Sequence, residues 1–482
     1  MKKMCLILII VLAFSLRLYR LNAPLADWHS WRQADTSAVS RNFVQQGFDV
    51  LHPRFDDLSS MGSGIDNPEG YRFVEFPIYN LIHAALFKTL PIVSLEVWGR
   101  LISIFFSLGS LVFLYLIAKK YLGTKIALLA AFFFAVLPFN IYYSRVILPE
   151  PMMLLTSLGM IYFFGRWIEQ NSKTPKLQNS KLFLAVVFAV VSWLIKPFIL
   201  VLLLPITYLA WVKWRFNWRR YITLYLSILV SLLPFFFWRW WMSHFPEGIP
   251  FSTWLFNYGG IRFKGAFFWW LFAERIGKLI LGGWGLILLG LGIIVKPGKK
   301  EGLFFHSWLV AILAYFVIVA SGNVQHDYYQ VLAIPIICIF LAKGTYFLLV
   351  APKQYFNRLL CCLLFVVCCL FMFAFSWYQV RDFFNINNPV IIEAGKAVDR
   401  LVPKEAKVIA PYGGDTAFLY QTKRQGWPMG IEIEKMINLG AEYYVNINFG
   451  PETDWLMETY CVVEKTPGWV IIDLKRKCEF EL

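Results

Sequence analysis

The chain has 482 residues, of which 58% are hydrophobic and 16% charged, and its mean hydropathy is +0.57, which excludes an ordinary soluble globular protein. The net charge of +16 does not indicate nucleic-acid binding, because the basic residues stand in short clusters between apolar segments, as topology signals do. We therefore predict a mainly α-helical polytopic membrane protein that binds no nucleic acid.

The N-terminus begins with Lys2 and Lys3, followed by an apolar run from Met4 that lacks a small-residue cleavage site. We expect a retained first span with its N-terminus in the cytoplasm. Apolar segments near the length that crosses a bilayer predict eleven spans. They cover residues 4–21, 98–118, 125–143, 151–168, 182–197, 197–212, 221–242, 276–295, 303–320, 331–350 and 359–378.

Eleven alternating spans place every basic cluster between them on the cytoplasmic side, as the positive-inside rule requires. These clusters lie at residues 119–125, 173–181, 213–220, 296–300 and 353–358. The apolar segment 76–90, bracketed by Pro77 and Pro91, would invert that pattern if it crossed the membrane. We predict that it is an interfacial or re-entrant helix on the outer face. The spans that meet at Lys196-Pro197 are predicted to form a tight hairpin with an outer tip.

The same topology brings four polar segments to the outer face: loop 23–97, turn 142–150, loop 243–275 and segment 321–330. After residue 378 the apolar runs shorten and alternate, at 407–410, 441–447 and 469–474, with a helical pattern near 390–402. These features predict a small extracytoplasmic α/β domain over residues 379–482, following a membrane domain over residues 1–378. Gly413-Gly414-Asp415 is typical of a turn after a strand.

Two cysteines, Cys461 and Cys478, lie in this C-terminal domain. They could form a disulfide if the domain is extracytoplasmic, because that compartment is oxidising.

The first candidate for chemistry is Asp35, which lies in a polar run at residues 27–43 that opens the first outer loop. Desolvation near an apolar boundary raises the basicity of a carboxylate, so Asp35 could take a proton from an acceptor hydroxyl or amine. The alternative is an exposed loop acid paired with Arg32 or Arg41. Arg32 is also a candidate for substrate binding.

Glu75 precedes the predicted interfacial helix and could bind the acceptor, ligate a metal or cap the helix. A divalent metal held by Asp35, Glu75 and His326 is one option, but oxygen-rich sites cannot be recognised from such distant residues. The metal requirement therefore stays open.

Further candidates stand at the outer ends of spans. Arg145 and Glu150 are candidates for substrate binding, because ionisable residues at this depth are expensive unless they are paired or functional. Arg145 has the planar geometry that matches phosphate oxygens, although a structural Arg145–Glu150 salt bridge is the alternative. His326 and Tyr329 could hydrogen-bond a donor phosphate, whereas the neighbouring Tyr328 fits an aromatic belt at the interface.

Four short motifs occur in this order along the chain: residues 31–36 (WRQADT), 75–77 (EFP), 143–150 (YSRVILPE) and 326–329 (HDYY). Together they resemble GT-C membrane glycosyltransferases of the glycosyltransferase 39 group, which includes protein O-mannosyltransferases and aminoarabinose transferases that modify lipid A. The resemblance covers residues 1 to about 350.

The resemblance implies inverting transfer from a polyprenyl-phosphate-linked sugar to an acceptor at the outer face of the plasma (inner) membrane. By position, Asp35 matches the catalytic acid of the family's first loop and Glu75 the acid before its interfacial helix. A single acid at Asp35 replaces the Asp-Glu pair common in protein mannosyltransferases, and residues 76–78 (FPI) replace a common Pro-Pro-Leu. The acceptor therefore stays open between a glycan, a lipid and a protein.

Two other classes remain as alternatives. A transporter or flippase for lipid-linked saccharides would carry ionisable residues near the bilayer midplane on internal repeats. A non-catalytic scaffold would use the C-terminal domain for partner binding.

Overall fold

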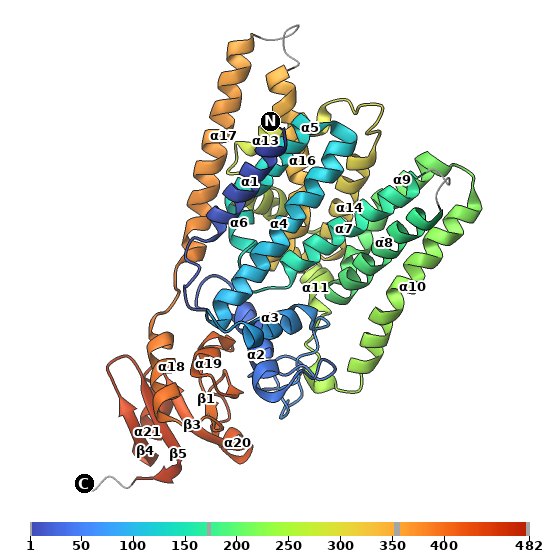
Figure 1. Cartoon of the computed structure of the whole chain (residues 1–482). Coiled ribbons are helices and arrows are strands. Elements are labelled where there is room, and N and C mark those ends of the chain that lie inside the picture. The colour runs from blue at the N-terminus through green and yellow to red at the C-terminus, as the bar shows by residue number, and fades with distance from the viewer. Residues whose placement is uncertain (1, 171–174, 351–356, 479–482) are drawn as a thin grey trace. The chain divides into compact units, whose positions relative to one another are not determined.

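The computed structural model describes residues 2–170, 175–350 and 357–478 (Figure 1). The contacts divide the chain into two compact units. Unit 1 comprises Met1–Tyr19, Leu101–Trp238 and Ser252–Asp382, and unit 2 comprises Arg20–Arg100, Arg239–Phe251 and Phe383–Leu482. The domain boundaries predicted at residues 378 and 379 stay a prediction. Lys173 and Lys353, from two of the basic clusters, lie outside the described residues.

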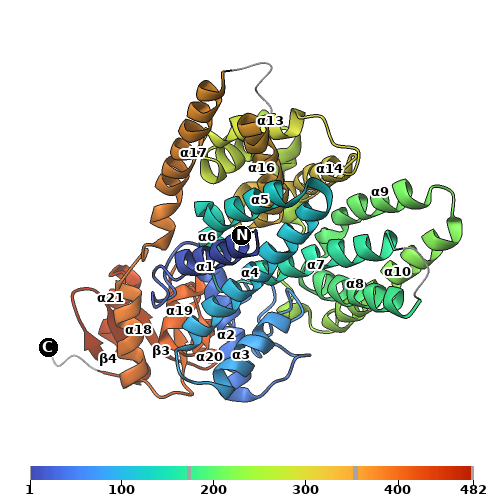
Figure 2. The ribbon, with the colours of Figure 1, turned by 45° about the horizontal axis from the view of Figure 1, so that its top comes forward.

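Unit 1 is helical, and each of the eleven predicted spans has a helical counterpart. In chain order these are α1 (Lys2–Arg17), α4 (Leu95–Leu122), α5 (Thr124–Val136) with α6 (Pro138–Tyr143), α7 (Glu150–Ile168), α8 (Pro175–Ile195), η1 (Pro197–Leu202) with α9 (Leu203–Trp214), α10 (Trp218–Met242), η4 (Trp269–Ile280) with α13 (Gly285–Ile294), α14 (Phe304–Ile318), η5 (Asp327–Ala333) with α16 (Ile334–Val350), and α17 (Arg358–Val380). Short turns α11 (Trp254–Asn257), η3 (Tyr258–Phe263), α12 (Gly265–Phe268) and α15 (Ala320–Gln325) connect them. Figure 2 shows α8 and α9 grouped with α7.

Within the described residues, five helices are long and apolar enough to cross a membrane. A sixth candidate is the pair Gly265–Ile280 and Gly285–Ile294, whose axes bend by 115°. Gly282 and Gly283 lie in this break with φ of 52° and 74°, and a side chain on Gly282 would place its Cβ 2.4 Å from the Met372 carbonyl oxygen. The continuous span predicted over residues 276–295 is therefore wrong, because the glycines interrupt the helix. The count of eleven crossings stays a prediction.

Hydrogen bonds and an ion pair provide partners for buried polar groups inside unit 1. Pro138 has no amide hydrogen for the Phe134 carbonyl one turn earlier, and that carbonyl instead accepts from the buried Arg17 guanidinium at 3.2 Å and from Asn140 at 2.6 Å. Lys343 of α16 forms an ion pair with Glu301, and both side chains are 4% exposed. Such charges are tolerated at depth only when paired.

Unit 2 begins with the first polar segment of the chain. The run that the sequence indicated as a loop is instead helix α2 (Ser30–Gln46), and it is buried along most of its length. Its apolar residues do not gather on one face, so hydrophobic periodicity does not indicate a helix here. Helix α3 (Ile78–Thr89) forms most of the predicted interfacial segment 76–90. At 12 residues it is too short to cross a bilayer.

The C-terminal part of unit 2 is a five-stranded mixed sheet in the order β2-β1-β3-β5-β4. The strands are β1 (Lys407–Ile409), β2 (Gly426–Trp427), β3 (Ala441–Asn446), β4 (Tyr460–Lys465) and β5 (Val470–Lys477), and the helices are α18 (Val390–Leu401), α19 (Thr416–Thr422), α20 (Ile433–Asn438) and α21 (Pro451–Thr459). The central strands β1 and β3 pair in parallel, whereas β5 runs antiparallel to both neighbours. The predicted small α/β fold is confirmed.

Alternate residues of the strands pack on opposite faces of this sheet. Val408 and Val445 belong to a core with α18 and α19, which also includes Ala26 from the first segment. Ile409 and Ile472 face a second core with α20 and α21. Burial on both faces requires apolar residues at successive strand positions.

The first polar segment also extends the sheet. The amide of Leu58 donates to the Gly426 carbonyl at 2.8 Å, and the amide of Gly426 donates to the Asp56 carbonyl at 2.9 Å. Gly426 is required by the close approach of β1, since a Cβ there would lie 1.7 Å from the Val408 carbonyl oxygen. Residues 56–58 thereby cover the β2 edge, which would otherwise expose unpaired backbone groups.

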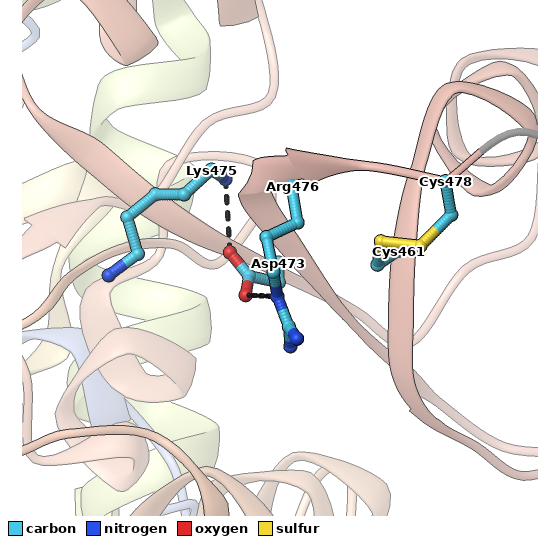
Figure 3. Close-up of a disulfide and its surroundings, with 5 residues drawn as sticks. All are labelled: Cys461, Asp473, Lys475, Arg476 and Cys478. Atoms are coloured by element: carbon cyan, nitrogen blue, oxygen red, sulfur yellow. Dashed lines mark hydrogen bonds and ion pairs between the residues drawn. A yellow bond between two sulfur atoms is a disulfide. The ribbon is translucent and has the colours of Figure 1, made fainter.

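At the opposite edge, Cys461 of β4 and Cys478 after β5 form a disulfide (Figure 3). Close to it, Asp473 accepts from the Lys475 amide at 3.0 Å and from the Arg476 side chain at 2.7 Å. The disulfide links the end of β5 to β4, and the bonds of Asp473 order the last residues of β5 itself.

Candidate functional site

Asp35 is held by two donors from different parts of unit 2. Its Oδ2 pairs with the Arg72 guanidinium at 2.6 Å, and its Oδ1 accepts from the Thr416 hydroxyl of α19 at 2.6 Å. The side chain is 4% exposed, so the alternative of an exposed loop acid paired with Arg32 or Arg41 is wrong. The Arg72 guanidinium and the Thr416 hydroxyl thus hold the two oxygens of the Asp35 carboxylate.

A second ion pair crosses between the same two segments. Arg32, one turn before Asp35 on α2, pairs with Glu75, three residues after Arg72. Each segment thus carries an arginine followed three residues later by an acid, and each arginine pairs with the acid of the other segment. The N-cap residue of α3 is Pro77, which forms no side-chain capping bond, and the carboxylate of Glu75 pairs with Arg32.

Three further acids surround this pair of ion pairs in unit 2. Burial raises the pKa of Asp56, Asp57 and Asp415 to about 6 in each case, and the charge of Asp35 adds to each rise. Asp56 is also ion-paired with Arg41, which opposes the effect of burial. The negative charge around Asp35 is therefore partly titratable near pH 6.

Unit 1 brings together two of the predicted residues around a lysine. Lys196 lies 3.4 Å from Glu150 and its ammonium lies 6.0 Å from the centre of the Tyr329 ring. Lys196 and Glu150 are 10% and 3% exposed. The structure thus pairs Glu150 with Lys196 instead of the Arg145 partner considered from the sequence.

Asp327 forms a neighbouring group in unit 1. It pairs with Arg275 at 2.5 Å and accepts from the Tyr143 hydroxyl at 3.3 Å. The adjacent His326 ring stacks on Tyr328, with 5.4 Å between ring centres. Tyr328 is 4% exposed, so it does not lie on the surface as a belt residue would.

Arg145 follows α6 in the turn before α7 and its side chain is fully buried in unit 1. The buried position is consistent with the unusual depth inferred for this charge. The structure therefore groups Arg32, Asp35 and Glu75 in unit 2, and Glu150 with Tyr329 in unit 1.

Sequence reasoning missed four residues of these groups: Arg72, Lys196, Arg275 and Thr416. Lys196 and Arg275 carried a detectable signal, because charges next to apolar spans are expensive and usually paired. Arg72 and Thr416 had no such signal, since each belongs to a polar segment. In the part of the chain that the structure describes, no group of three or more His, Cys, Asp or Glu side chains is arranged to hold a metal ion.

Comparison with known proteins addresses the architecture. Residues 78–241 match the family model described as dolichyl-phosphate-mannose-protein mannosyltransferase. The chain also aligns with the crystal structure of ArnT from Cupriavidus metallidurans bound to undecaprenyl phosphate, with a TM-score of 0.69, 13% identity and 97% of each chain covered. The chain has the GT-C fold.

Other GT-C structures align over most of this chain. An oligosaccharyltransferase from Archaeoglobus fulgidus, in complex with zinc and sulfate, gives a TM-score of 0.58 at 12% identity, covering 94% of this chain and 68% of its own. The arabinofuranosyltransferase AftD from Mycobacteria gives 0.59 at 12% identity, with 98% and 42% covered. No curated protein matches by sequence. The predicted fold class, a multi-pass membrane protein of GT-C type with a small C-terminal α/β part, is confirmed.

Proposed function

We propose that the protein is an inverting glycosyltransferase that moves a sugar from a polyprenyl-phosphate-linked donor to an acceptor at the outer face of the inner membrane. The observation that carries this proposal is the alignment over 97% of the chain with ArnT bound to undecaprenyl phosphate. A second aligned structure, AglB from Archaeoglobus fulgidus, is in complex with an inhibitory peptide and a dolichol-phosphate, with a TM-score of 0.55, 10% identity, and 92% of this chain and 69% of that chain covered.

Asp35 is proposed as the general base. Its carboxylate takes the proton of the acceptor hydroxyl while the acceptor oxygen forms a bond to the anomeric carbon. The bond from that carbon to the phosphate oxygen breaks, and polyprenyl phosphate leaves with the electron pair. The burial of the side chain and the Arg72 contact support this role, because they hold the carboxylate in one orientation away from bulk water. Glu75, held by Arg32, is proposed to bind the acceptor.

Residues of unit 1 are proposed to bind the donor phosphate. Arg145, Lys196 and Arg275 are cationic; Lys196 pairs with Glu150 and Arg275 with Asp327, and the Arg145 side chain is buried. Cations stabilise the charge that develops on a leaving phosphate, and tyrosine and histidine can donate hydrogen bonds to it. His326 and Tyr329 are proposed for that second role, and Glu150 for holding Lys196 in place.

The extracytoplasmic location of the C-terminal part is supported by the disulfide between Cys461 and Cys478. Disulfides persist in oxidising compartments and are rare in the cytosol. An N-terminus in the cytoplasm, a first outer loop over residues 23–97, and the division into residues 1–378 and 379–482 belong to the same proposal. The sugar, hexosyl or pentosyl, and the acceptor, a glycan, lipid or protein, are left to experiment.

Purified protein in liposomes, supplied with radiolabelled polyprenyl-phosphate sugars and a membrane extract as acceptor, tests this proposal. Asp35→Asn should lower transfer by roughly 100-fold or more, the range for losing a general base. Asp49→Asn is the matched control, because Asp49 is an exposed acid of the same segment and pairs only with a nearby histidine, His52. Equal transfer by Asp35→Asn and wild type would refute the role of Asp35.

Transport of a lipid-linked saccharide predicts a different result in that assay. A flippase moves label across the liposome bilayer without forming a new glycosidic bond, and a scaffold does neither. Transfer of label to a new acceptor is expected here. Movement of intact donor without transfer would favour the flippase.

A further inference from the structure

Helix α19 presents one polar face to the segment that contains the proposed base. Thr416 and Tyr420, one helical turn apart, lie on this face, and Gln421 next to them contacts the same part of the chain. Gln421 donates to the Leu25 carbonyl at 2.9 Å, and the Tyr420 hydroxyl donates to Glu96 at 2.7 Å. The contacts hold α19 on the N-terminal part of unit 2.

Thr416 is the member of this face that reaches Asp35. Its hydroxyl lies 2.6 Å from Asp35 Oδ1 and 3.1 Å from the Trp31 carbonyl oxygen. A hydroxyl has one proton to donate. Because the contact to Asp35 is shorter and its acceptor is a carboxylate, we infer that the hydroxyl donates its hydrogen bond to Asp35. Because Arg72 holds the other oxygen at 2.6 Å, the two donors together fix the plane of the carboxylate.

The local backbone determines the position of the Thr416 side chain without the help of a substrate. Gly413 and Gly414 adopt φ of 62° and 84°, the left-handed conformation that favours glycine, and they turn the chain after β1. Asp415 then caps α19 by accepting from the Ala417 amide at 2.7 Å. Thr416 is the first residue of the helix and is 8% exposed.

We propose that Thr416 is a positioning residue for the transfer reaction, and that the C-terminal domain thereby contributes to the proposed active site. This inference rests on the proposed function, because Thr416 acts through Asp35 and does not itself touch the substrate. Its hydroxyl keeps Asp35 in one orientation, so that the same lone pair faces the acceptor in every turnover.

The test compares three variants in the transfer assay. Thr416→Val removes the hydroxyl and keeps the side-chain shape, and it should lower kcat roughly 10- to 100-fold, the range for a hydrogen bond to a charged group. KM for the donor should change less than about twofold, since donor binding is assigned to other residues. Thr416→Ser keeps the hydroxyl and should recover most of the wild-type kcat.

Thr422→Val is the matched control on the same helix. Thr422 is fully buried and its hydroxyl donates to the Leu419 carbonyl of its own helix at 2.6 Å. This variant should keep the wild-type kcat. If Thr416→Val does not yield a folded, monodisperse protein, Thr416→Ala removes the same hydroxyl with a smaller side chain.

Four results would overturn the inference. Equal kcat for Thr416→Val and Thr422→Val would do so, as would a Thr416→Ser variant as slow as Thr416→Val, or a Thr416→Val effect confined to KM. Those three outcomes leave the proposed function intact. The fourth is failure of the premise: a wild-type protein that transfers no sugar overturns the proposed function as well, and an Asp35→Asn variant as fast as wild type overturns the role of Asp35.

Discussion

Removing the disulfide of the C-terminal sheet should lower the stability of unit 2 by a calculable amount. Cys461 and Cys478 are 17 residues apart, and closing a loop of that size removes chain entropy from the unfolded state worth about 3 kcal/mol at 25 °C. For a folding unit of 150–250 residues, each kcal/mol shifts the midpoint by about 2–4 °C. We therefore expect the double variant Cys461→Ser/Cys478→Ser to unfold roughly 6–12 °C below wild type.

Limited proteolysis at rising temperature measures this change, with an epitope at the C-terminus to follow unit 2 alone. Cys5→Ser is the control, because Cys5 is an exposed free cysteine of α1 and should leave the midpoint unchanged. A double variant within about 2 °C of wild type would refute the reasoning. So would a wild-type midpoint that does not move when the protein is fully reduced.

Three further changes test other parts of the structure. Burial raises the pKa of Asp57 from 3.8 to about 6, so the folded protein binds more protons than the unfolded chain between these values and stability falls as pH rises through that window. Asp57→Asn should raise the free energy of unfolding at pH 7 by up to about 3 kcal/mol and change it little at pH 4, as unfolding midpoints at the two pH values would show. Lys343→Met leaves Glu301 buried without its cation and should lower stability by about 3–5 kcal/mol. Adding Glu301→Gln should restore part of that loss, which a double-mutant cycle of unfolding midpoints would measure. Gly426→Ala places a methyl group 1.7 Å from a carbonyl oxygen and should expose residues 56–58 to protease, whereas unchanged protection would contradict the close approach of β1.

The sequence predicted the apolar helical segments of unit 1, apart from the break at Gly282, because length and apolarity indicate them. It also predicted α18, β1, β3 and β5, whose apolar residues alternate or repeat at the helical period. The short strand β2 and the edge strand β4 were missed, since two residues carry no period and β4 is partly exposed. The break at Gly282 was missed as well, because glycine occurs freely inside membrane helices.

The candidate site was predictable only in part. Asp35 and Glu75 were recognisable as acids beside apolar boundaries. Helix α2 was not recognised, because most of the residues that it buries are polar and show no apolar period. The partners of Asp35 come from sequence-distant segments, and no local pattern records that Arg72 and Thr416 converge on one carboxylate. Long-range polar pairing of this kind depends on tertiary structure.

The contact between Asp35 and Thr416 sets an order of events during synthesis, since the two residues are 381 positions apart. At about 5–20 residues per second, the ribosome makes Thr416 roughly 20–75 s after Asp35. Throughout that interval α2 lacks α19 and residues 56–58 lack the β2 edge, so Asp35 can pair with Arg72 but lacks the Thr416 hydroxyl. The proposed base would therefore be assembled only when the last fifth of the protein has left the ribosome, and a chain that terminates early would be inserted but inactive.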